Sequence, residues 1–125
     1  MAKILVIDDE VSMRTMVQKT LVRDGHEVFQ AGSGREALEY LKNHPVDLIV
    51  TDLYMPDMDG IELTIRIGQQ TLKPPIIAMS GGGFTAKEEL LETARRMGAG
   101  RTLAKPFAPA DLLQAVRDLL PGTTP

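Results

Sequence analysis

Five residues with reactive or metal-binding side chains each follow a short apolar run of the sequence. They are Asp8, Asp9, Asp52, Ser80 and Lys105. Carboxylates that lie within a few ångströms of one another repel, so a cluster of these acids needs a cation beside it. Mg2+ prefers oxygen ligands and commonly joins one or two carboxylates to a phosphate group. These side chains therefore indicate magnesium-dependent phosphate chemistry, provided that the fold brings them together.

The apolar runs are the predicted strands, at residues 3–8, 27–31, 47–51, 75–79 and 101–104. Between the strands, apolar residues recur at helical spacing. The residues with this spacing are Met13, Met16, Val17, Thr20 and Leu21, then Ala37, Leu38 and Leu41, then Leu90, Leu91 and Ala94, and finally Leu112, Val116, Leu119 and Leu120. Strict alternation of five strands with five helices predicts right-handed crossovers and a parallel sheet with helices on both faces. The predicted fold class is α/β, a three-layer sandwich.

All strands of a parallel sheet point the same way, so the residues that follow the strands meet at one edge. Folds of this kind place their ligands at that edge. We therefore expect Asp8 and Asp9 after the first strand, Asp52 after the third, Ser80 after the fourth and Lys105 after the fifth to lie close together.

Four segments of the chain resemble the receiver domain of bacterial two-component response regulators. They are "VIDDE" (6–10), "DLIVTDLYMPDMDG" (47–60), "PIIAMSG" (75–81) and "GAGRTLAKPF" (98–107). They occur in the order and at the separations usual for the family, and the resemblance runs from Lys3 to Leu120. It implies a flavodoxin-like sheet in the strand order 2-1-3-4-5. It also implies a single, chemotaxis-regulator-like receiver domain at 1–120, with 121–125 as a tail or the start of a linker.

The resemblance also implies roles for individual residues. Asp52 is the expected phosphoacceptor. It would receive the phosphoryl group from the phosphohistidine of a sensor histidine kinase or of a histidine phosphotransfer protein. Ser80 is the expected switch hydroxyl, and Lys105 the partner of a phosphoryl oxygen. The expected Mg2+ ligands are Asp8 (through water), Asp9, Asp52 and the main-chain carbonyl of Tyr54. On this view the chain is a signalling domain, not an enzyme, that promotes its own phosphorylation and dephosphorylation.

Two positions depart from the family pattern. Thr102 stands where many members have an aromatic residue that changes rotamer together with the switch hydroxyl, so that aromatic coupling cannot operate here. Tyr54 is bulky where smaller or more polar residues are common. We expect a downstream protein to bind the face made by the fourth predicted helix, the fifth strand and the fifth helix. This face comprises Ala86 to Met97, Arg101, Thr102 and Pro109 to Arg117.

Each candidate residue also has a purely structural interpretation. One acid within residues 8–10 could cap the following helix, since acids favour helix N-termini. Asp52 could be a turn residue, and Ser80 could begin the glycine turn that follows it. Lys105 could be an ordinary surface lysine, although a cis bond before Pro106 would aim its ammonium inward. Two adjacent acids facing a third favour the metal site over capping.

Two other functions remain as alternatives. The segment "GGGFTA" (81–86) fits the dinucleotide-binding pattern Gly-x-Gly-x-x-Ala, but the next strand, "RTLAKPF" (101–107), lacks the expected acid. A Mg2+-dependent phosphohydrolase could also use a nucleophilic aspartate. However, Tyr54 stands two residues after Asp52, where haloacid-dehalogenase-like phosphatases place an acid.

Composition limits the choice further. The 125 residues, 43% hydrophobic and 25% charged with no cysteine, fit one globular domain with a sizeable core. A net charge of −3 gives no basic field, so we expect no direct DNA partner and no membrane binding. The apolar run Ile4 to Ile7 is too short for a signal peptide or a membrane span. We therefore expect a cytoplasmic location.

Overall fold

The structure is a computed structural model and describes residues 2–53, 60–69, 74–80, 92, 95 and 98–120. For residues 60, 61, 64 and 68 it describes the main chain alone. None of the helices within these ranges combines the length and the apolar character that a membrane span requires.

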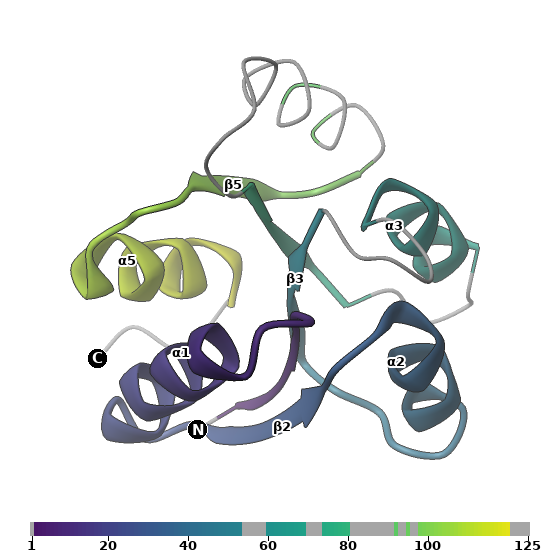
Figure 1. Cartoon of the computed structure of the whole chain (residues 1–125), viewed down its shortest axis with the longest axis horizontal. Coiled ribbons are helices and arrows are strands. Elements are labelled where there is room, and N and C mark those ends of the chain that lie inside the picture. Colours follow the sequence, from purple (N-terminus) through teal and green to yellow (C-terminus); the bar gives the residue numbers. More distant parts are fainter. Residues whose placement is uncertain are drawn as a thin grey trace.

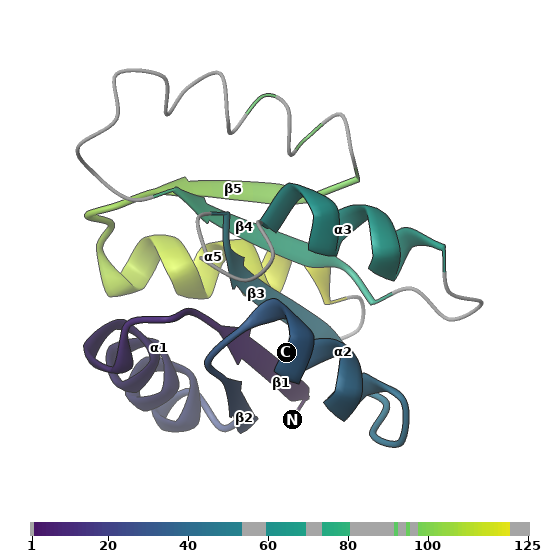
Figure 2. The same ribbon diagram turned by 45° about the vertical axis from the view of Figure 1, so that its right-hand side comes forward.

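Five parallel strands form one sheet in the order β2-β1-β3-β4-β5, as predicted. The strands are β1 (Lys3–Ile7), β2 (Glu27–Ala31), β3 (Leu48–Asp52), β4 (Ile76–Ser80) and β5 (Arg101–Ala104). Every predicted strand end lies within one residue of the observed one. Figure 2 shows the strands one above another, from β2 to β5.

Four helices are present in the described part of the chain, where five were predicted for the whole. They are α1 (Val11–Arg23), α2 (Gly34–Leu41), α3 (Gly60–Gly68) and α5 (Pro109–Leu119). Leu90, Leu91 and Ala94, on which the remaining predicted helix is built, lie outside the described residues. In Figure 1, α1 and α5 cover one face of the sheet, and α2 and α3 cover the other, which confirms the three-layer architecture.

The core consists of two clusters of apolar side chains, one on each face of the sheet. Residues of the same strand alternate between them. Ile4 and Val6 lie in the cluster under α1 and α5, whereas Leu5 and Ile7 lie in the cluster under α2 and α3. In β3, Leu48 and Val50 belong to the first cluster and Ile49 to the second. Because both faces are covered, the central strands read as continuous apolar runs in the sequence.

Local contacts fix where the helices begin and end. Gly25 has φ 93°, a left-handed conformation that lets the chain leave α1 and enter β2. The hydroxyl of Ser33 accepts a hydrogen bond from the Glu36 N–H at 3.1 Å and so caps α2. A carboxylate oxygen of Asp111 accepts from the Ala108 N–H at 3.1 Å at the start of α5.

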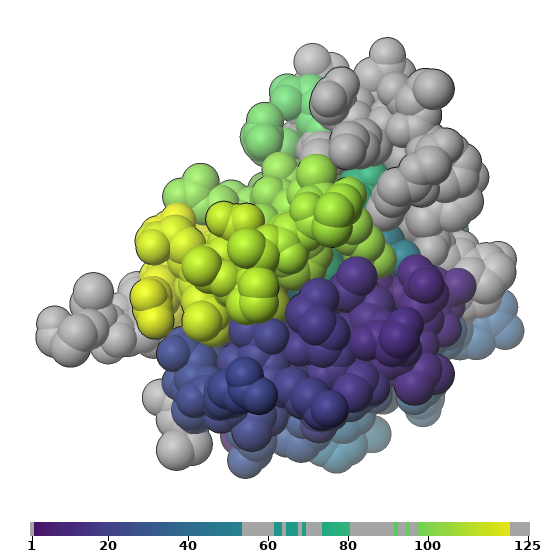
Figure 3. All heavy atoms as spheres, turned by 60° about the vertical axis from the view of Figure 1, so that its left-hand side comes forward, coloured from purple at the N-terminus to yellow at the C-terminus, as the bar shows by residue number. Residues whose placement is uncertain are grey.

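The helices α1 and α5 lie side by side on one face of the molecule (Figure 3). Leu21 of α1 and Val116 of α5 are fully buried in the same core cluster. The end of α5 also covers the start of β5. A Cβ added at Gly100 would lie 2.7 Å from Cδ2 of Leu119, so the helix approaches the strand closely at this point.

Candidate functional site

Strands β1, β3 and β5 bring three of the predicted residues together at one edge of the sheet. Asp8 directly follows β1, Asp52 ends β3, and Lys105 directly follows β5. Asp8 continues the alternation of Ile4 and Val6, so it occupies a position on the α1 and α5 side of the sheet. By the same count Asp52 continues Leu48 and Val50, and Lys105 continues Leu103. The strand alternation therefore places the two acids and the lysine on one side.

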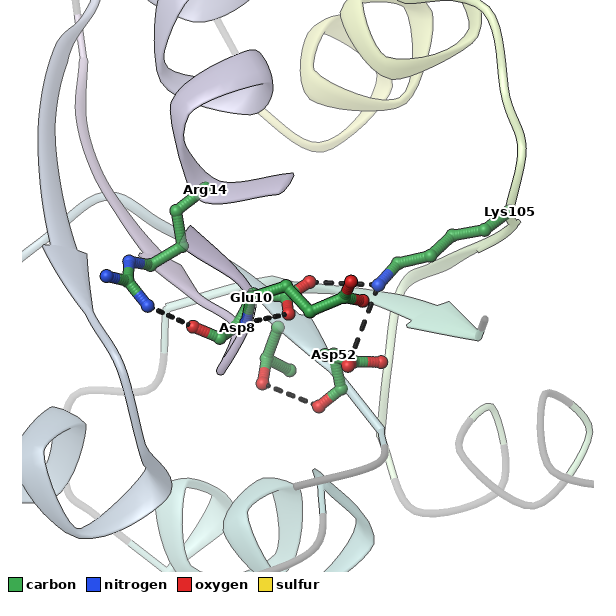
Figure 4. Close-up of polar contacts among 6 residues, drawn as sticks. Asp8, Glu10, Arg14, Asp52 and Lys105 are labelled. Atoms are coloured by element: carbon green, nitrogen blue, oxygen red, sulfur yellow. Dashed lines mark hydrogen bonds and ion pairs between the residues drawn. The ribbon is translucent and has the colours of Figure 1, made fainter. Parts of the chain in front are cut away.

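The charged groups of this site are close together and largely buried. Asp8 is 0%, Asp52 4% and Lys105 8% exposed, whereas Asp9 is exposed. One carboxylate oxygen from each of Asp8, Asp9 and Asp52 lies within 4.8 Å of the others. Nζ of Lys105 donates to Oδ2 of Asp8 at 2.9 Å and lies 3.6 Å from Oδ2 of Asp52 (Figure 4). The Lys105–Pro106 peptide is cis, which is the geometry considered above for directing the Lys105 ammonium inward.

Both oxygen atoms of the Asp8 carboxylate have partners. Oδ2 accepts from Lys105, and Oδ1 accepts from the N–H of Glu10 at 2.9 Å. Glu10 is the N-cap residue of α1, and within the described residues its side chain makes no capping hydrogen bond. The capping interpretation of the acids therefore does not hold for Glu10, and Asp8 is oriented toward the site by contacts on two sides.

Lys105 remains protonated in this site. Burial lowers the pKa of its ammonium, but the hydrogen bond to Asp8 and the charges of Asp52, Asp8 and Glu10 raise it. The attraction is the larger effect, so the pKa of Lys105 lies above its ordinary value. The lysine therefore stays charged and neutralises one of the carboxylates.

The donor set fits a hard divalent cation. Three carboxylates and one ammonium leave two negative charges (3 − 1 = 2) in a mostly buried site. Burying uncompensated charge is costly, and a divalent cation would neutralise this excess. The three acids offer oxygen ligands alone, which suits Mg2+ better than a softer metal.

Of the other two predicted site residues, the structure describes Ser80 but not Tyr54. Ser80 ends β4, is 3% exposed, and its main-chain carbonyl accepts from the Lys105 N–H at 2.8 Å. It lies one position beyond Met79, which pairs with Asp52 in the sheet. The main-chain carbonyl of Tyr54 lies outside the described residues.

Two arginines that the sequence analysis did not single out make contacts here. One contacts the main chain of Asp8, and the other contacts Thr102 in β5. Nη1 of Arg14 donates to the main-chain carbonyl of Asp8 at 2.6 Å. Nη2 of Arg95 donates to the Thr102 hydroxyl at 3.2 Å, so an arginine reaches the position that many family members fill with an aromatic ring. For Arg14 a weak signal exists in the sequence: it lies four residues after Glu10, one helical turn from the acidic segment.

Comparison with known proteins places these features in a family. The family model described as response regulator receiver domain matches residues 4–117. A chemotaxis protein CheY homolog from Campylobacter jejuni is 38% identical and covers 94% of this chain and 92% of its own length. The alkaline phosphatase synthesis transcriptional regulatory protein PhoP of Bacillus subtilis is also 38% identical over 94% of this chain, which spans only 48% of that relative.

Solved structures agree with the sequence comparison. The chemotaxis response regulator CheY4 of Vibrio cholerae has a TM-score of 0.84 at 34% identity, over 96% of this chain and 99% of that chain. NtrX from Brucella abortus has a TM-score of 0.87 at 31% identity, over 95% of this chain and 26% of that chain. The fold, the acidic edge of the sheet and the relatives agree: the chain belongs to the family of receiver domains of two-component response regulators.

Proposed function

We propose that this receiver domain accepts a phosphoryl group on the carboxylate of Asp52, from a phosphohistidine of a sensor histidine kinase or a histidine phosphotransfer protein. The observation that carries the proposal is the position of Asp52. Asp52 is the last residue of the central strand β3. One of its carboxylate oxygens lies within 4.8 Å of an oxygen of Asp8 and of Asp9, and Oδ2 lies 3.6 Å from the Lys105 ammonium. Family membership favours this function over dinucleotide binding and phosphate-ester hydrolysis.

In the proposed reaction, a carboxylate oxygen of Asp52 attacks the phosphorus atom of the phosphohistidine. The new O–P bond makes an acyl phosphate, and the electrons of the broken P–N bond remain on the imidazole. Phosphoryl transfer spreads negative charge over the phosphoryl oxygens, and the charged Lys105 is placed to stabilise it. Bound by Asp8, Asp9 and Asp52, Mg2+ would supply further neutralisation of that charge. For the carbonyl of Tyr54 the family resemblance alone supports a role as ligand.

The phosphoryl group would change the contacts of two residues at the strand ends. Lys105 now bonds to Asp8, and a phosphoryl oxygen on Asp52 would compete for its ammonium. Ser80 is the proposed switch hydroxyl, because it ends the strand next to β3 and its carbonyl already bonds to the main chain of Lys105. A shift of either residue would be transmitted to β5, which ends at Ala104.

The proposed output surface is the face of β5 and α5, together with residues 86–97, of which only Glu92 and Arg95 are described. A hollow of about 310 Å³ lies on this face, between the strand and the helix. Its lining includes Thr102, Phe107 and Ala115. Since Thr102 accepts a hydrogen bond from Arg95, movement of β5 would alter the surface that a downstream protein contacts.

Acetyl phosphate tests the phosphoacceptor directly, because no kinase is needed. The protein is incubated with acetyl phosphate and Mg2+, and its intact mass is followed over time. We expect one added phosphoryl group in the wild type and none in Asp52→Asn. Phosphorylation of Asp52→Asn at the wild-type rate would overturn the assignment of Asp52. Omission of Mg2+ tests the metal requirement in the same assay.

A further inference from the structure

The loop that carries the acids of the site is held at both ends. At one end the N–H of Asp8 donates to the carbonyl of Ala31 at 3.2 Å, which extends the pairing of β1 with β2 by one residue. At the other end α1 begins at Val11. Between these points the chain leaves the sheet, and the carbonyl of Asp8 takes its hydrogen bond from a side chain, the guanidinium of Arg14.

We propose that Arg14 is a positioning residue for the metal-binding acids: its guanidinium fixes the main chain of Asp8 so that Asp8 and Asp9 are presented in a binding geometry before the metal arrives. This inference rests on the proposed function, because it concerns the Mg2+ site. In Figure 4 Arg14 approaches Asp8 from the side opposite to Lys105, so the two cations hold the same residue from two directions.

Arg14 is itself held by a short chain of side chains. Its Nε donates to Oε1 of Gln30 at 3.1 Å, and Nε2 of Gln30 donates to Oε1 of Gln18 at 2.6 Å. Gln30 belongs to β2 and Gln18 to α1, so the guanidinium is anchored to the strand that pairs with β1 and, through Gln30, to the helix that follows the acidic loop. A Cβ at Gly32 would lie 3.2 Å from Nη1, and glycine at this position leaves the guanidinium its space.

The geometry requires an arginine and not merely a positive charge. Nη1 and Nε donate at the same time to two acceptors, and both are uncharged oxygens, a main-chain carbonyl and a side-chain amide. The planar guanidinium presents its N–H groups in a fixed fork, whereas lysine offers one flexible point charge. Arg14→Lys therefore keeps the charge and loses the fork.

If Arg14 acted only through its charge, its replacement would change the Mg2+ affinity in the direction opposite to that expected for a positioning residue. A cation beside the acids repels Mg2+, so removing its charge in Arg14→Met would tighten metal binding if charge were all that mattered. Loss of positioning weakens binding in both Arg14→Lys and Arg14→Met. Groups that orient metal ligands typically change metal affinity by about 10-fold or more when they are replaced.

The experiment is a Mg2+ titration followed by backbone amide shifts in nuclear magnetic resonance, on wild type, Arg14→Lys, Arg14→Met and the control Arg66→Met. Arg66 lies on α3 and is half exposed, where it pairs with Glu62. We expect the dissociation constant to rise about 10-fold in both Arg14 variants, with melting temperatures close to that of the control. The inference would be overturned if both Arg14 variants bound Mg2+ as tightly as the wild type. It would also be overturned if Arg14→Met bound Mg2+ more tightly while Arg14→Lys kept the wild-type affinity.

A second measurement needs no metal. The N–H of Glu10 donates to the Asp8 carboxylate, so its hydrogen exchange in the metal-free protein reports the order of the loop. We expect about 10-fold faster exchange at Glu10 in both Arg14 variants and wild-type rates throughout β1. Unchanged exchange at Glu10, or faster exchange throughout the domain, would overturn the inference. If the wild type fails to bind Mg2+, the proposed function fails, and this exchange measurement still decides the role of Arg14.

Discussion

The protonation of Lys105 affects both the charge of the site and the stability of the fold. Its ammonium is buried with Asp8 and Asp52, and its pKa lies above the ordinary value because their attraction outweighs the effect of burial. A raised pKa means that the folded state binds the proton more tightly than the unfolded state does. The contribution of Lys105 to stability is therefore fully present below the unfolded pKa and is lost as pH rises through the folded one.

This sign predicts alkaline destabilisation that depends on Lys105. Between neutral pH and about 10.4, the ordinary lysine value, the advantage of wild type over Lys105→Met in free energy of unfolding is expected to be constant. Above that value it should shrink. Urea unfolding at a series of pH values measures it, and Lys42→Met, which removes an exposed lysine of a surface ion pair, should follow the wild-type curve. A difference that grows with pH would contradict the assignment.

Asp52, the proposed phosphoacceptor, is expected to lower the stability of the metal-free protein. One carboxylate oxygen of Asp52 lies within 4.8 Å of an oxygen of Asp8 and of an oxygen of Asp9, and these like charges repel one another. Two unit charges about 4 Å apart in water repel each other by about 1 kcal/mol. We expect metal-free Asp52→Asn to be more stable than wild type by about 1 kcal/mol in urea unfolding, and this advantage to diminish when Mg2+ is added. A variant less stable than the metal-free wild type would show that the attraction to Lys105 dominates.

At the scale of elements, the contact between β5 and α5 is close enough to test by adding one methyl group. In Gly100→Ala the new Cβ would meet Leu119 at 2.7 Å, and the leucine side chain must move. Because the clash is with the end of a partly buried side chain that can shift, we expect a cost of up to about 1 kcal/mol. The matched background is Leu119→Ala, where the space is free and Gly100→Ala should be neutral or slightly stabilising. Equal effects in both backgrounds would exclude the clash.

The elements also show what the sequence could and could not predict. The central strands β1 and β3 were predictable to within one residue because both faces of the sheet are covered, so these strands contain the apolar runs Ile4 to Ile7 and Leu48 to Val50. The convergence of Asp8, Asp52 and Lys105 followed from the direction of parallel strands. The contact of Arg95 was not predictable, and that of Arg14 had only the weak signal of its spacing from Glu10, because each contact depends on how far a long side chain reaches across the fold.

At the scale of the whole molecule, the proposal is that the acidic edge and the face of β5 and α5 respond together. A partner that binds the phosphorylated form more tightly must stabilise that form in return, typically by about 1–3 kcal/mol. Addition of beryllium fluoride and Mg2+, which imitate the phosphoryl group, should shift resonances in residues 84–104 and on α5 as well as at the acids. The same additions to Asp52→Asn should leave that face unchanged. Shifts confined to Asp8, Asp9, Asp52 and their neighbours would exclude it as the output surface.

The alternation of core side chains between the two faces of the sheet also restricts how the chain can change in evolution. Deletion of one residue between Ile4 and Ile7 would exchange the two faces of β1 and turn Asp8 toward the cluster under α2 and α3. Its carboxylate would then lie among apolar side chains and away from Lys105. A change in the length of β1 or β3 by one residue therefore takes an acid of the site to the wrong side of the sheet unless a bulge absorbs it, so the lengths of these strands are tied to the chemistry.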